Sequence, residues 1–136
     1  MRKLTCSILL LSLVFFIMNC KTQNTASYSY SDGNGNYYLI EKTNISFKPV
    51  TPDMSSSGTY SGGEPITVKI SEEQYKKLME LVNAAIDAKS MHISERVKMS
   101  GMISISQKGN AQTYILGARS RSKADIESYL KQLFKK

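Results

Sequence analysis

Residues 66–88 read ITVKISEEQYKKLMELVNAAIDA, and this stretch decides the fold because its apolar residues change their period in the middle. At first every second residue is apolar: Ile66, Val68 and Ile70 alternate with polar neighbours, which is typical of a short strand. After Ser71 the apolar residues recur every three or four positions, as they do on one side of a helix. The sequence therefore predicts a strand that is followed directly by a helix.

The predicted helix has a well-marked beginning. Ser71, with Gln74 three residues later, has the pattern of a capping box, in which each side chain bonds the backbone N–H of the other residue. We expect the helix to extend to about Ala88. Its buried stripe is predicted to consist of Tyr75, Leu78, Met79, Val82, Ala85 and Ile86.

Upstream of this unit, residues 37–47 are predicted to form one strand, which Pro49 and Pro52 end. Its buried face is expected to carry side chains of one parity, namely Leu39, Thr43, Ile45 and Phe47. Residues 54–65 (MSSSGTYSGGEP) are rich in serine and glycine, and this composition predicts a loop.

Downstream, two strands and a helix complete the fold. Residues 97–106 and 113–117 are predicted to be strands, joined by a hairpin turn around residues 108–110. Ser122, with Asp125 three residues later, is predicted to cap the last helix. The element order is then β-β-α-β-β-α, and we expect an α+β fold in which a small antiparallel sheet carries both helices on one face. The expected core residues here are Ile103, Ile105, Tyr114, either Leu116 or Ile115, Ile126, Tyr129, Leu130, Leu133 and Phe134.

The N-terminus has the layout of an export signal. Arg2 and Lys3 precede an apolar stretch from Leu4 to Met18, which is shorter than the ~20 residues that a membrane-spanning helix needs. We therefore expect residues 1–19 to be a removable signal peptide. Because an exported protein seldom meets nucleic acid, we exclude nucleic acid as a partner.

The sequence Ile17-Met18-Asn19-Cys20 resembles the lipobox of bacterial lipoprotein precursors, in which an aliphatic residue stands three positions before the cysteine. Met18 and Asn19 stand where small residues are usual. The resemblance implies cleavage between Asn19 and Cys20 and a lipid on the Cys20 thiol. It also implies that the protein is anchored in the cell membrane or outer membrane, with its domain outside the cytoplasm. The alternatives are an uncleaved signal anchor and cleavage without lipid.

Residues 20–36 read CKTQNTASYSYSDGNGN, and we predict that the lipidated cysteine is followed by a flexible tether to Asn36. The folded domain is then expected to comprise residues 37–136. Charge within this domain is uneven, because ten basic residues and three acidic ones lie between Lys89 and Lys136. This basic half could favour anionic head groups or an acidic protein; the alternative is an ordinary solvated surface.

The sequence shows no constellation of catalytic or metal-binding residues. His92 is the only histidine, so the closely spaced ligand set of a zinc site is missing. The serines lack the context of a nucleophile with a positioned base, and the glycines form no phosphate-binding pattern. We therefore predict no catalytic residue, no metal and no cofactor, and a protein that is not an enzyme.

The candidate interaction surface is the Ser- and Gly-rich loop, together with basic residues of the C-terminal half. Small residues allow another surface to approach closely, and an exposed aromatic side chain can anchor it. The alternative is an ordinary solvent-exposed loop. The predicted function is a non-enzymatic, lipid-anchored cell-envelope protein that binds another protein or an envelope component. The candidate residues are Ser57, Tyr60, Gly62, Gly63, Arg119 and Arg121.

A second pattern is similar in order to the emfourin-type inhibitors of thermolysin-like proteases. In that family a Gly-Gly pair, a strand, an apolar helix, a tyrosine-bearing strand and a closing helix follow one another. The resemblance implies an alternative function, namely inhibition of a secreted or envelope metalloprotease. The residues that carry it are Gly62-Gly63, Leu78, Leu81-Val82, Ala84-Ala85 and Tyr114.

Overall fold

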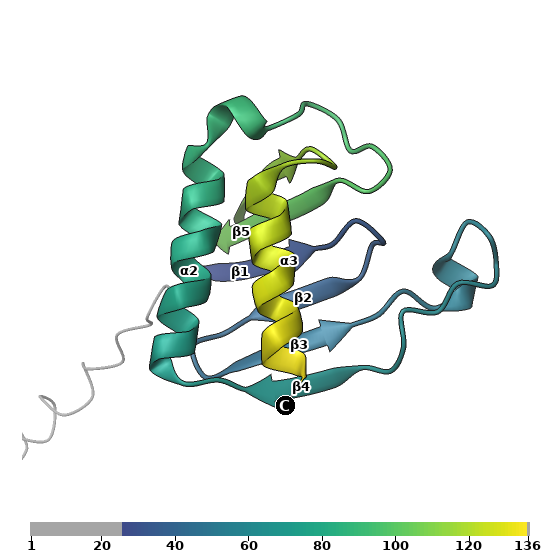
Figure 1. Cartoon of the computed structure of the whole chain (residues 1–136), viewed down its shortest axis with the longest axis horizontal. Helices are drawn as coiled ribbons and strands as arrows, with labels where there is room; N and C mark the ends of the chain where they lie inside the picture. Colours follow the sequence, from purple (N-terminus) through teal and green to yellow (C-terminus); the bar gives the residue numbers. More distant parts are fainter. Residues whose placement is uncertain (1–25, 136) are drawn as a thin grey trace, which may run out of the picture.

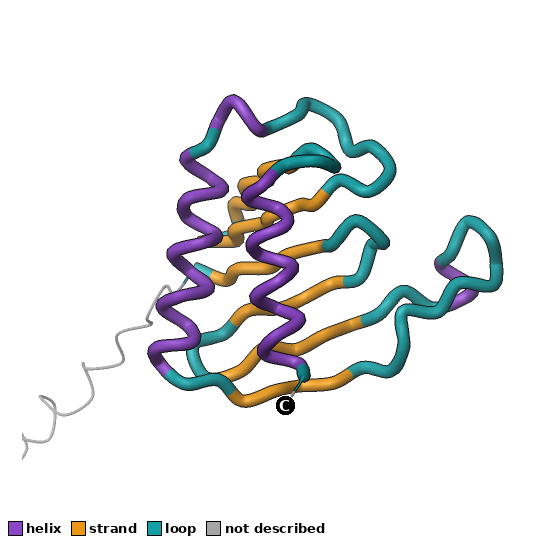
Figure 2. The backbone as a smooth tube through the Cα atoms, viewed as in Figure 1, coloured by secondary structure: helices purple, strands orange, loops and turns teal. Residues whose placement is uncertain are grey.

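Six antiparallel strands form one open sheet, and two helices pack on one of its faces (Figure 1). The structure, a computed structural model, describes residues 26–135. The strands are ordered β4-β3-β2-β1-β5-β6 across the sheet. The predicted α+β class, antiparallel sheet and placement of both helices on one face are confirmed (Figure 2). The elements are β1 (Ser27–Ser31), β2 (Tyr37–Ile40), β3 (Asn44–Lys48), β4 (Ile66–Lys69), α2 (Glu72–Asp87), β5 (Gly101–Gln107), β6 (Asn110–Leu116) and α3 (Arg121–Phe134), with short 3-10 turns η2 (Pro52–Met54) and η3 (Lys89–Met91).

The predicted order β-β-α-β-β-α is wrong, because four strands precede α2. One of the additional strands comes from residues 37–47, which form a hairpin of β2 and β3 instead of a single strand. The amide of Glu41 donates to the carbonyl of Asn44 at 3.0 Å and closes the turn. This turn changes the parity of the buried side chains, so that Ile40 faces the core and pairs with Ile45.

The other additional strand is β1, and the prediction of a flexible tether to Asn36 is wrong for residues 27–36. β1 lies in the middle of the sheet, between β2 and β5. Its serines alternate with Tyr28 and Tyr30, and Tyr30 is fully buried. The folded part therefore begins about ten residues before the predicted start at Tyr37. The predicted signal peptide (1–19), its cleavage site and Cys20 lie outside the described residues.

The predicted start of α2 is confirmed. The Ser71 hydroxyl accepts the amide of Gln74 at 3.2 Å, and the Ser71 amide donates to the Gln74 side chain at 2.8 Å. The predicted cap of the last helix is displaced by two residues, because Ser120 and not Ser122 accepts the amide of Lys123. Ser122 instead lies in the first turn of α3.

The predicted hairpin near the C-terminus is confirmed, with different strand ends. Lys108 and Gly109 both have positive φ (52° and 79°), as a two-residue type I′ turn requires. β5 begins only at Gly101, because the amide of Ser100 bonds the carbonyl of Val97 in a turn. β6 begins at Asn110, directly after the turn, rather than at residue 113.

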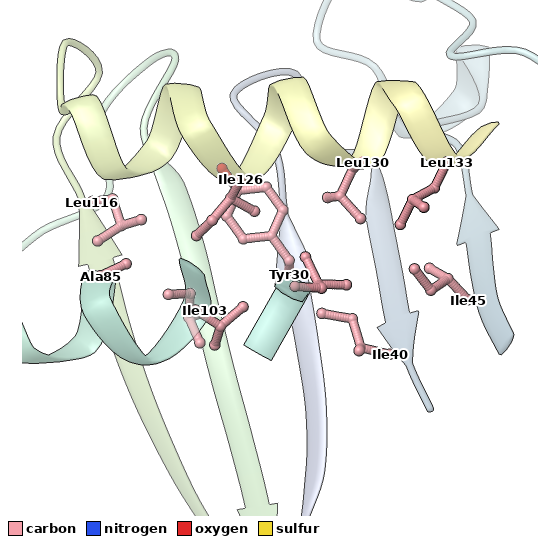
Figure 3. Packing of buried hydrophobic residues seen from close by; sticks show 11 residues of the cluster. Tyr30, Ile40, Ile45, Ala85, Ile103, Leu116, Ile126, Leu130 and Leu133 are labelled. Atoms are coloured by element: carbon pink, nitrogen blue, oxygen red, sulfur yellow. The ribbon is translucent and has the colours of Figure 1, made fainter. Parts of the chain in front are cut away.

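The core lies between the sheet and the two helices (Figure 3). Ile126 and Leu130 of α3 pack over Tyr30 and its neighbours, and α2 contributes Leu78 and Val82. Leu116, rather than Ile115, is the buried residue at the end of β6. The fully or nearly buried apolar residues are Tyr30, Ile40, Ile45, Leu78, Val82, Ala85, Ile103, Leu116, Ile126, Leu130 and Leu133.

Candidate ligand-binding groove

Three connections meet at one end of the sheet. The register places the end of β1 beside the start of β2 and of β5, and the end of β3 beside the start of β2. The β1–β2 turn, the β3–β4 loop and the segment before β5 therefore lie together, and the β3–β4 loop projects beyond the sheet (Figure 1). They enclose an open groove of about 760 Å³, whose walls are residues 33–35, Val50, residues 54–57, Tyr60 and residues 98–99.

The projecting loop is braced by its own serines. The Ser57 hydroxyl lies 2.9 Å from the Ser55 hydroxyl and accepts both the hydroxyl (3.2 Å) and the amide (3.4 Å) of Thr59. The amide of Gly58 donates to the carbonyl of Ser55 at 3.0 Å. These short-range bonds give the loop a defined shape without a hydrophobic core.

The base of the loop is fixed to the β1–β2 turn. The side-chain oxygen of Asn36 accepts the amide of Val50 at 3.0 Å, and the carbonyl of Val50 accepts the amide of Gly62 at 2.9 Å. A Cβ atom on Gly62 would overlap the Asn36 side-chain oxygen and approach Pro49. Gly63 has a φ of 106°, which favours glycine. Both glycines therefore shape the loop and do not line the groove.

The β1–β2 turn is held by the buried carboxylate of Asp32. One carboxylate oxygen accepts the amides of Asn34 and Asn36, each at 2.9 Å, and the other accepts the Asn36 side-chain amide at 2.9 Å. Arg96 donates to the Asp32 carbonyl at 3.2 Å and so connects the turn to the segment before β5. All three walls of the groove are thus joined through one turn.

A buried cluster of three side chains connects this turn to α3. Glu127 accepts the Tyr30 hydroxyl at 3.0 Å and the Gly33 amide at 3.3 Å, and its other oxygen lies 3.0 Å from the Lys123 ammonium group. The side chains of Lys123 and Glu127 are only 9% and 20% exposed. Within residues 26–135 every buried side-chain nitrogen or oxygen has a hydrogen-bond partner. The polar groups of this cluster are therefore buried without the cost of a missing hydrogen bond.

The two tyrosines near this cluster have raised pKa values. Burial is the main cause for Tyr30, followed by the negative charge of Glu127, and the pKa of its phenol lies far above the ordinary value. Burial, together with Asp32 and Glu127, raises the pKa of Tyr38 to about 12. Both phenols therefore remain protonated at neutral pH, and Tyr30 acts as a fixed hydrogen-bond donor.

The groove surface combines apolar side chains with backbone and hydroxyl groups. Met54, Tyr60 and Met99 are 72%, 38% and 45% exposed, so three large side chains with apolar surface gather around one groove. Lys98 is the one charged side chain among the lining residues. Such a surface can hold an extended ligand through apolar anchors and backbone hydrogen bonds.

The structure separates the six predicted interaction residues. Ser57 and Tyr60 lie on the groove, and Gly62 and Gly63 support its loop. Arg119 and Arg121 lie at the start of α3, away from the projecting loop (Figure 1). Neither arginine is among the residues that line the groove, so their predicted part in binding stays a prediction.

Two groups of groove residues were not predicted from the sequence, namely the β1–β2 turn and Lys98 with Met99. The turn falls within the predicted tether, although Asp32 and Asn36 bracket a Gly-rich turn of a common type. Met99 has a φ of 65°, which no sequence pattern indicated. His92 lies elsewhere, because its ring bonds the Ala85 carbonyl at the end of α2 at 2.8 Å.

Metal-binding clusters and membrane-spanning helices are absent from the described part of the chain. Residues 26–135 contain no cluster of three His, Cys, Asp or Glu side chains that could hold a metal ion. None of the helices in this range has the length and apolar character needed to cross a membrane. No protein family, no curated protein and no solved structure matches this chain.

Proposed function

We propose that this protein is a non-enzymatic, lipid-anchored module of the cell envelope that binds a segment of another envelope component in the groove. One observation carries the proposal: exposed apolar side chains surround a groove whose three walls are cross-braced. Preorganisation lowers the entropy that binding must offset, so bracing of this kind favours a recognition surface. The alternative, an ordinary solvent-exposed loop, does not account for the exposed Met54, Tyr60 and Met99. It also does not account for the hydrogen bond from the Gly33 amide to Glu127 of α3.

The position of the groove agrees with an anchor on Cys20. β1 begins at Ser27 at one end of the sheet and reaches the groove at its other end, a rise of roughly 17 Å for five residues. A chain that is held by its N-terminal side would therefore present the groove away from the lipid surface. This orientation suits capture of a partner and not insertion of the groove into the membrane.

The lining residues support binding rather than turnover. No Asp, Glu, His or Cys is among them, so a general acid or base would have to be Lys98 or Tyr60. The Ser57 hydroxyl already takes part in three hydrogen bonds within the loop. The groove therefore lacks the pair of activated groups that most hydrolytic mechanisms use.

Affinity capture with the tagged full-length chain tests this function. We expect the double substitution Met54→Ala/Tyr60→Ala to lose a partner that the wild-type protein retains, because it removes two exposed apolar anchors. The matched control is Arg119→Ala/Arg121→Ala, which alters two exposed side chains outside the groove and should retain the partner. Equal capture by both double variants would contradict the proposal.

A second candidate function is inhibition of an envelope or secreted metalloprotease, as the emfourin resemblance implies. The loop between β3 and β4 favours it, because the loop projects beyond the sheet and could enter a protease cleft (Figure 1). The hydrogen bonds of the Ser57 hydroxyl with Ser55 and Thr59 hold the loop in one shape, which lowers the entropy cost of such binding. Titration of zinc metalloproteases of the thermolysin type with the full-length protein should then lower their activity stoichiometrically. Unchanged protease activity at molar excess would remove this candidate.

A further inference from the structure

Three aromatic rings form an apolar floor beside the C-terminal half of α3. The ring of Tyr38 lies 5.0 Å from Phe47 and 5.8 Å from Phe134, and Phe47 lies 5.9 Å from Phe134 (centroid distances). Ile66, which is 50% exposed, and Leu130 complete a pocket of about 260 Å³. The pocket is large enough for one apolar side chain but small for an acyl chain.

Two lysines flank this apolar pocket. Lys131 and Lys135 both line it, and their spacing of four residues places them on the same side of α3. Neither lysine forms an ion pair with a carboxylate in the part of the chain that the structure describes. An apolar pocket with two lysines at its edge that form no ion pair with a described residue is complementary to an apolar group that carries a negative charge beside it.

The pocket and the groove lie on either side of a third, smaller recess. A small polar recess between them shares Gly33 and Met99 with the groove, and Tyr38 and Lys131 with the apolar pocket. In addition, Tyr60 contributes to the raised pKa of Tyr38, as expected for neighbouring phenols. One extended ligand can therefore occupy both depressions.

We propose that the pocket binds an apolar side chain of a partner peptide, and that an adjacent aspartate or glutamate of that peptide pairs with Lys131 and Lys135. This inference rests on the proposed function, because it names the ligand class of the same binding surface. A membrane lipid is the less suitable occupant. Phe47 lies near the end of β3 and pairs with Ile66 at the start of β4, so both are at the groove end of the strands, opposite the end where β1 begins.

Selection from a random peptide library on the immobilised full-length protein, extracted in mild detergent, tests the proposal. We expect wild-type protein to enrich peptides in which a Phe, Leu or Ile stands next to an Asp or Glu. Charge reversal, Lys131→Glu/Lys135→Glu, should shift the enriched charge at that position from acidic to basic. It should also weaken the best wild-type peptide about tenfold or more. Because both lysines are on the surface, the fold should tolerate this change.

The control variant Lys89→Glu/Lys108→Glu makes the same change in net charge at two exposed positions outside the pocket, and it should retain the wild-type preference. An unchanged peptide preference in Lys131→Glu/Lys135→Glu would overturn the inference. If Tyr60→Ala nevertheless weakened binding of the enriched peptides, the proposed function of the groove would still stand. Failure of the wild-type protein to enrich any peptide would overturn the inference, whereas the proposed function would fall only if affinity capture also gave no partner that depends on Met54 and Tyr60. Binding to phosphatidylglycerol vesicles that the charge reversal abolishes, without peptide enrichment, would overturn the inference in favour of a lipid.

Discussion

Replacement of Glu127 by alanine tests how the groove is held to the rest of the fold. The substitution removes the carboxylate that lies 3.0 Å from the ammonium group of Lys123, whose side chain is 9% exposed. It also removes the acceptor of the Tyr30 hydroxyl and of the Gly33 amide. One buried cation and two donors therefore lose their partner at once.

The expected loss of stability is large for a single surface-proximal residue. Removing one partner of a buried ion pair costs about 3–5 kcal/mol, and we expect about 3 kcal/mol because some solvent reaches Glu127. The free energy of unfolding of a domain of this size is about 5–15 kcal/mol, so the loss is a substantial fraction of it. At about 4 °C per kcal/mol, the melting temperature should fall by about 12 °C.

Urea unfolding followed by circular dichroism, with thermal melting, measures this loss. The matched control is Asp125→Ala on the same helix, because the ion pair of Asp125 with Arg121 has the same spacing but is 3.9 Å long and mostly exposed. We expect that control to lose less than about 0.5 kcal/mol. The apolar replacement Lys123→Met/Glu127→Leu should recover only the part of the loss that comes from the unpaired Lys123 ammonium group, because the Tyr30 hydroxyl and the Gly33 amide still lack their acceptor. A loss in Glu127→Ala no larger than in Asp125→Ala would refute the reasoning.

Four further predictions concern the loop, the tyrosines, the helix cap and the anchor. Gly62→Val should lower the free energy of unfolding by about 1–3 kcal/mol in urea titrations, because its side chain overlaps Asn36, whereas Ser61→Val beside it should have little effect. The raised pKa of Tyr38 means that the folded state holds this proton more tightly, so its contribution to stability is complete below about pH 10 and is lost as the pH rises through about 12; a tyrosinate absorbance titration in which every tyrosine ionises with the ordinary pKa would be inconsistent with this. Ser71→Ala should cost about 1 kcal/mol by loss of the cap, while Ser71→Asp should retain most of the stability in the same unfolding assay. Cys20→Ala should release the protein from the membrane fraction on cell fractionation, and an unchanged membrane association would argue against a lipid on this thiol.

The elements that the sequence predicted correctly are those that local interactions determine. The capping box at Ser71, the stripe of α2 and the turn at Lys108-Gly109 each depend on residues within one or two turns of the chain. β1 was missed because its alternation is between serine and tyrosine. Tyrosine is apolar enough to fill a core when a partner such as Glu127 accepts a hydrogen bond from its hydroxyl group.

The candidate site was only partly predictable for the same reason. The composition of the β3–β4 loop indicated Ser57 and Tyr60, which do line the groove. The connection of Tyr30 to Glu127 joins residues 97 positions apart, and no local pattern encodes such a contact. The prediction of Arg119 and Arg121 depends on charge alone, and charge does not determine which edge of the sheet a residue lies near: these arginines follow β6 at one edge, and the loop precedes β4 at the other.

Site-specific photo-crosslinking in living cells tests the central claim most directly. A photoreactive amino acid is placed at Tyr60 in the groove of the full-length chain or, as a control, at the exposed Thr113 on β6. We predict a discrete cross-linked product from position 60 that is lost when Met54 is also replaced by alanine, and none of the same mass from position 113. The same products from both positions, or no product from position 60, would contradict the account.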